Sequence, residues 1–147
     1  MVTPHLRSFG FTTGNAEASA SFLVNALGFR RQGDAQILEG GAYGDLVGLP
    51  GARLKLLRLL IGTDVLELTE ILDPGPGARA GRPIAADSRS TDRWFQHICL
   101  VVNAMDKALA GLEPALAAGT ITPISTAPQR LPDWNTSAAG IVAYKFR

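Results

Sequence analysis

Val65-Leu66-Glu67-Leu68-Thr69 sets one acidic side chain in an apolar, strand-like run, and Phe95-Gln96-His97-Ile98-Cys99-Leu100-Val101 does the same with a histidine. Successive side chains of an extended chain point to opposite faces, so Glu67 and His97 each share a face with residues two positions away. An ionised carboxylate is rarely buried without a charge partner or a metal. The two segments therefore predict metal-capable side chains on strands that could face a common pocket.

Composition limits the classes of partner. The chain has 147 residues, enough for one domain or two small modules around a shared sheet. Its 14 Lys and Arg nearly cancel its 13 Asp and Glu, so no general charge footprint for nucleic acid or an anionic membrane is present. No apolar stretch is long enough for a membrane anchor or signal peptide. The single cysteine, Cys99, is expected to be buried and fits a reducing cytoplasm.

Local signals in the first half predict a strand, a helix and a hairpin. Residues 6–13 are strand-like, and Asn15 is a suitable N-cap for a helix through Leu27, which Gly28 would stop. Residues 37–49 are rich in glycine and favour a short helical or irregular excursion. A hairpin is expected from residues 53–61 and 65–72 across a turn at residues 62–64.

A second cycle follows one clear break in composition. Between Asp73 and Asp92, prolines and glycines disfavour regular structure and indicate a linker. After it we expect a strand, a helix ended by Gly119 and two further strands, at residues 95–102, 104–118, 121–125 and 141–146. Both halves thus begin with a strand, a helix and a strand.

Several motifs in this order match one superfamily: Leu6-Arg7-Ser8-Phe9-Gly10-Phe11, Asn25-Ala26-Leu27-Gly28-Phe29, Val65-Leu66-Glu67-Leu68, the His97 segment and Ala143-Tyr144-Lys145-Phe146-Arg147. With them the chain resembles the vicinal oxygen chelate superfamily, which includes glyoxalase I, bleomycin-resistance proteins and extradiol dioxygenases. The resemblance implies one α+β, glyoxalase-like domain over residues 1–147. Two βαβββ modules would form a curved, mostly antiparallel mixed sheet, a cup with helices on its outer face. They would span residues 1–72 and 94–147, the second incomplete, with a linker at 73–93.

The resemblance also implies a divalent metal site. Family ligands come from the first and fourth strands of one module and the first and last strands of the other. Glu67 and His97 match two of these positions. The first-strand position falls on Ser8, whose neutral hydroxyl is a poor ligand. Any Zn, Ni, Mn or Fe ion is therefore expected to be held loosely, if at all.

The fourth ligand, a glutamate on a last strand, has no counterpart before Arg147. Three interpretations stay open: the sequence is truncated, the natural protein is degenerate, or a second chain supplies the strand. A missing strand would leave an unpaired sheet edge, which favours a homodimer.

Each candidate residue has a simpler structural alternative. Glu67 could instead pair with Arg7, Arg53 or Arg58, and His97 could be a neutral core histidine that bonds a backbone carbonyl.

The substrate-facing candidates are Ser8, Trp134 and Lys145. Trp134 could stack on a ligand or cap the core. Lys145 and Arg147 share one face of the last expected strand, where they could favour an anionic substrate or lie in solvent. Arg89 or Arg93, in and next to a polar stretch before the His97 segment, could approach a carboxylate or phosphate, with linker solvation as the alternative. Glu70 and Glu39 could serve as proton shuttles by charge alone, and surface positions are the expectation for both.

Two functions remain under the resemblance, and no catalytic residue or substrate is assigned. The first is a glyoxalase-like lyase or isomerase that uses a divalent metal to stabilise an enediolate-type intermediate of a small-molecule substrate. The second is a metal-independent binding or sequestering protein of the bleomycin-resistance type. Both predict a cytoplasmic protein.

Overall fold

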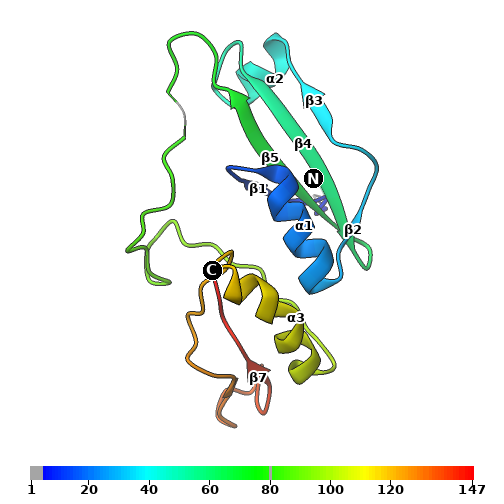
Figure 1. The fold of residues 1–147 in the computed structure, drawn as a ribbon, viewed down its shortest axis with the longest axis vertical. Helices are drawn as coiled ribbons and strands as arrows, with labels where there is room; N and C mark the ends of the chain where they lie inside the picture. Colours follow the sequence, from blue (N-terminus) through cyan, green and yellow to red (C-terminus); the bar gives the residue numbers. More distant parts are fainter. Residues whose placement is uncertain (1–4, 80) are drawn as a thin grey trace, which may run out of the picture. The chain divides into compact units, whose positions relative to one another are not determined.

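A computed structural model describes residues 5–79 and 81–147. The chain divides into two compact units, Met1–Ile84 (unit 1) and Ala85–Arg147 (unit 2), and each is described by itself. The boundary falls inside the proline- and glycine-rich segment that the sequence marks as a linker (Figure 1).

Unit 1 is built on one mixed sheet with the order β1-β5-β4-β2, in which β3 also pairs with β4. Strand β1 runs parallel to β5, and the other pairs are antiparallel. This confirms the predicted α+β class with a mostly antiparallel mixed sheet. The elements are β1 (Phe9–Thr12), α1 (Ala16–Leu27), β2 (Arg30–Arg31), β3 (Gln36–Leu38), α2 (Gly41–Leu46), β4 (Arg53–Ile61) and β5 (Asp64–Asp73).

Helix α1 begins and ends where its capping residues predict. The Asn15 side chain accepts a hydrogen bond from the backbone amide of Ala18, which satisfies one of the donors left free at a helix start. Gly28 has a φ of 73°, a left-handed conformation that glycine adopts without the penalty a Cβ would bring. The predicted helix is confirmed.

The core of unit 1 lies between α1 and one face of the sheet. Leu57 and Leu59 of β4 are fully buried, and they stand opposite Leu68 and Leu66 of β5. Glu70 shares the face of Leu68 and accepts a hydrogen bond from the Ala16 amide, so this is the face that α1 covers. Each buried leucine contributes about 2 kcal/mol.

The opposite face of the sheet carries the alternate residues. Arg58 and Glu67 lie there together with Leu56 and Leu60, and all four are partly exposed. This face is called the open face below.

Unit 2 has one long helix and little sheet. Its elements are α3 (Met105–Ala117), β6 (Gln129–Arg130) and β7 (Val142–Ala143), and the two strands pair with each other. Pro123 and Phe146 form an isolated bridge. No helix within the described residues is long and apolar enough to cross a membrane.

The strand expected at residues 95–102 is wrong. That segment forms no strand within the described part of the chain, and Val101 is 94% exposed. A strand exists only through its ladder of hydrogen bonds to a neighbour, and an alternating apolar pattern does not supply one. The expected strands at 121–125 and 141–146 are reduced to the isolated bridge and to the two residues of β7.

Candidate functional site

Glu67 and Arg58 form the centre of the open face of unit 1. The two residues stand directly opposite each other on β5 and β4. The Arg58 Nε donates to Glu67 Oε1 across 2.7 Å, and both side chains are about a third exposed or less. A cross-strand pair of opposite charge at this distance is a charge-assisted hydrogen bond.

Ser8 completes this group, called the Arg58–Glu67–Ser8 cluster. Gly10 of β1 is in register with Glu67, and Ser8 lies two residues earlier, so both face the same side. The Ser8 hydroxyl donates to Glu67 Oε2 across 3.1 Å. The structure therefore brings together the two positions of the first module that the superfamily resemblance marks as ligand positions.

Hydrogen bonds hold Glu67 in its charged form. The bond from the Arg58 guanidinium is the largest cause that lowers the pKa of Glu67 below its ordinary value, and partial burial opposes it. The Ser8 bond and the charges of Arg58 and Arg7 lower the pKa further. Glu67 is thus an ionised carboxylate at neutral pH whose two oxygens both accept hydrogen bonds from the protein.

The cluster does not fit a divalent metal ion. Arg58 places a full positive charge against the one carboxylate that would bind the metal, and Ser8 occupies its second oxygen. Among the described residues no group of three or more His, Cys, Asp or Glu side chains gathers around a possible ion. Because Glu67 lies in unit 1 and His97 in unit 2, their joint use as ligands stays a prediction.

The candidates of unit 2 are mostly exposed. His97 is exposed, so the alternative of a buried core histidine is wrong, and Cys99 is exposed where burial was expected. Both lie in the segment that has no strand partner to cover it. Trp134 is 81% exposed, so it does not cap the core of its unit. The ammonium of Lys145 lies 4.9 Å from the centroid of the Phe95 ring, a cation–π contact rather than a fully solvated position.

The two spare glutamates have structural positions. Glu70 accepts hydrogen bonds from the Ala16 amide at 3.0 Å and from the Lys55 ammonium at 3.4 Å, so it stabilises the start of α1 instead of lying in solvent. Glu39 is exposed as expected and lies 3.5 Å from Arg53. None of these contacts joins Glu70 or Glu39 to Glu67.

Comparison with known proteins identifies the fold. Neither a family model nor a curated protein matches the sequence. Among solved structures, a glyoxalase family protein from Bacillus cereus is similar to this chain with a TM-score of 0.63 at 16% identity, over 90% of this chain and 83% of that one.

The chain has a glyoxalase fold. This confirms the fold class expected from the superfamily resemblance. At 16% identity the likeness extends to the fold and not to an activity. Within the glyoxalase fold, the properties of this chain therefore have to be argued from its own side chains. The Arg58–Glu67–Ser8 cluster is a charged, partly exposed group of unit 1 at the positions that the resemblance marks.

Proposed function

We propose that the chain is a metal-independent binding protein that takes up a small organic molecule on the open face of unit 1. The observation that carries the proposal is the state of Glu67, whose two oxygens accept hydrogen bonds from Arg58 and Ser8. In a metal enzyme of this fold the carboxylate would be free for the ion. Here a guanidinium neutralises it instead.

The open face offers both polar and apolar contacts to such a molecule. Arg58 has five N–H donors, of which its Nε donates to Glu67, and its side chain is 34% exposed. Leu56 and Leu60 flank it on the same face and are partly exposed. A small ligand with an oxygen acceptor for Arg58 and an apolar body over the leucines fits this surface.

The test combines metal analysis with ligand binding. Protein purified without chelator is assayed for Zn, Ni, Mn and Fe, and a panel of aromatic carboxylates is screened by calorimetry. We expect less than stoichiometric metal, and a ligand whose Kd rises about tenfold in Arg58→Gln. Arg53→Gln is the matched control. Arg53 is the first residue of the same strand, its side chain is 54% exposed, and it lies outside the Arg58–Glu67–Ser8 cluster.

A metal-dependent lyase or isomerase of the glyoxalase type is the second candidate. It is favoured by the contact between Ser8 and Glu67, which brings together the two ligand positions that the superfamily resemblance implies for the first module. It would require Arg58 to release the carboxylate. Stoichiometric metal that is lost in both Glu67→Gln and His97→Ala would support this candidate and contradict the binding protein.

Three further predictions do not depend on which of the two functions is correct. A homodimer, a cytoplasmic location and the contacts of Trp134 and Lys145 with a substrate stay predictions. Size-exclusion chromatography with light scattering measures the first of these directly.

A further inference from the structure

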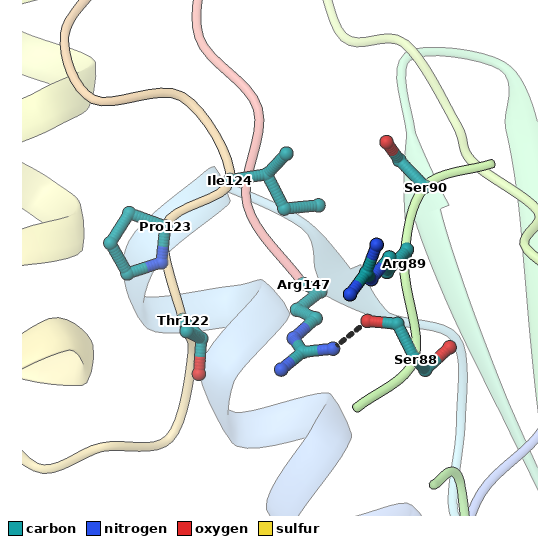
Figure 2. A pocket seen from close by; sticks show the side chains of 7 residues that line it. All are labelled: Ser88, Arg89, Ser90, Thr122, Pro123, Ile124 and Arg147. Carbon is teal, nitrogen blue, oxygen red and sulfur yellow. Dashed lines mark hydrogen bonds between the residues drawn. The ribbon is translucent and has the colours of Figure 1, made fainter. Parts of the chain in front are cut away.

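Unit 2 contains a cavity of about 240 Å³ that the proposed function does not use. It is called the arginine cavity here. Its lining residues come from the segment that opens the unit, from the stretch after α3 and from the last residue: Ser88, Arg89, Ser90, Thr122, Pro123, Ile124 and Arg147 (Figure 2).

Positive charge dominates among the side chains that line this cavity. Two of its seven lining residues are arginines and none is acidic. Figure 2 shows the Arg89 and Arg147 side chains extending into the same hollow. The nearby carboxylate of Asp92 accepts hydrogen bonds from the Ser88 hydroxyl and the Arg89 amide, so it is tied to the backbone turn. Two guanidinium groups that share a hollow repel each other, and a bound anion relieves that repulsion.

Hydrogen bonds within unit 2 hold one wall of the cavity. Arg147 donates from Nη1 to the Ser88 carbonyl and from Nη2 to the Ala86 carbonyl, and its backbone pairs with that of Thr122. Ser88 is only 8% exposed and also accepts a hydrogen bond from the Trp94 indole. A site that is already ordered loses less entropy on binding.

We propose that the arginine cavity binds a small oxyanion of the phosphate class. The planar guanidinium fork of Arg89 matches phosphate oxygens, and Arg147 adds positive charge while its Nη1 and Nη2 donate to the Ser88 and Ala86 carbonyls. The hydroxyls of Ser90 and Thr122 line the same space as further donors. Pro123 and Ile124 give it an apolar wall, which accommodates a small carbon group attached to the phosphate. Every lining residue belongs to unit 2, so this site shares no residue with the open face of unit 1.

The experiment titrates the full chain with inorganic phosphate at low salt and follows the backbone amides by NMR. We expect shifts concentrated at Ser88–Ser90 and Thr122–Ile124, with a Kd that rises about tenfold in Arg89→Gln. Arg93→Gln is the control, since Arg93 is an exposed arginine of the same segment outside the lining. It should change the Kd by less than about twofold.

Three results would overturn the proposal. One is the lack of localised shifts, and another is an equal loss of affinity in the Arg89 and Arg93 variants, which would reveal nonspecific charge attraction. The third is tighter binding of acetate than of phosphate at equal ionic strength, which would assign the site to carboxylates. Because Arg89→Gln leaves unit 1 unaltered, ligand binding at the open face is measured separately in the same variant.

Discussion

Glu67 keeps its charge on a largely apolar sheet because its hydrogen-bond partners compensate for partial burial. Its side chain is 24% exposed, and the lowered pKa means that the folded protein stabilises the carboxylate more than the unfolded chain does. Hydrogen bonds to charged groups contribute about 1.5–3 kcal/mol, and solvent access reduces this. About 1 kcal/mol of stability is thus expected from the Arg58–Glu67–Ser8 cluster.

This contribution should depend on pH. The folded pKa of Glu67 lies below the ordinary value of 4.5, so the stabilisation is complete above that pH and is lost as pH falls through the folded pKa. Glu67→Gln should be less stable than the original protein by about 1 kcal/mol at pH 7, and the gap should narrow in acid. Urea unfolding at a series of pH values measures both quantities.

The matched control is Glu39→Gln. Glu39 is 70% exposed and lies 3.5 Å from Arg53, so this change should cost less than about 0.5 kcal/mol at every pH. A stability gap for Glu67→Gln that stays constant between pH 7 and pH 3 would mean that the ionised carboxylate is not what the cluster stabilises.

Which arginine pairs with Glu67 depends on the length of the turn between β4 and β5. The sequence offered Arg7, Arg53 and Arg58 without a choice, and it assigned residues 62–64 to the turn. The structure has Ile61 opposite Asp64, a two-residue turn, and that register places Arg58 opposite Glu67. The alternation of the strands predicted which residues share a face with Glu67. The turn is one residue shorter than the sequence predicted, and this turn length decides which residue stands opposite Glu67.

At the scale of elements, the predictions that held rest on local signals. Asn15 and Gly28 define α1 through hydrogen bonds and a backbone angle within a few residues of the helix. Residues 95–102 have an equally regular pattern, but a strand also needs a partner elsewhere, and the pattern carries no information on it. In the structure this segment has no assigned strand, and Val101 is exposed.

Hydrogen exchange tests this difference directly. The amides of Leu57 and Leu59 lie in a strand with neighbours on both sides, so they should be among the most protected in unit 1. Amides of residues 97–102 form no strand ladder within the described chain and should exchange close to the rate of an unfolded peptide. Protection at 97–102 comparable to that of β4 would mean that the segment is paired as a strand after all.

At the scale of the whole molecule, side-chain bonds decide where the second unit starts. The composition break indicated a linker over residues 73–93, which begins with prolines and glycines and ends in a polar stretch. The structure places the boundary at Ile84, because Arg147 holds the Ala86 and Ser88 carbonyls and Trp94 bonds the Ser88 hydroxyl. Composition alone does not predict that Arg147, which lies 59 residues after Ser88, donates hydrogen bonds to this segment.

Limited proteolysis distinguishes the two parts of this segment. With a protease of broad specificity, the first cut should fall between Asp73 and Ala85, because residues 85–93 are tied to their unit and a protease needs a locally extended chain. Arg147→Gln removes the bonds to Ala86 and Ser88, so early cuts should then appear in 85–93 as well. Early cuts in 85–93 of the unaltered chain would mean that these bonds do not hold the segment in solution, and the arginine cavity would lose one of its walls.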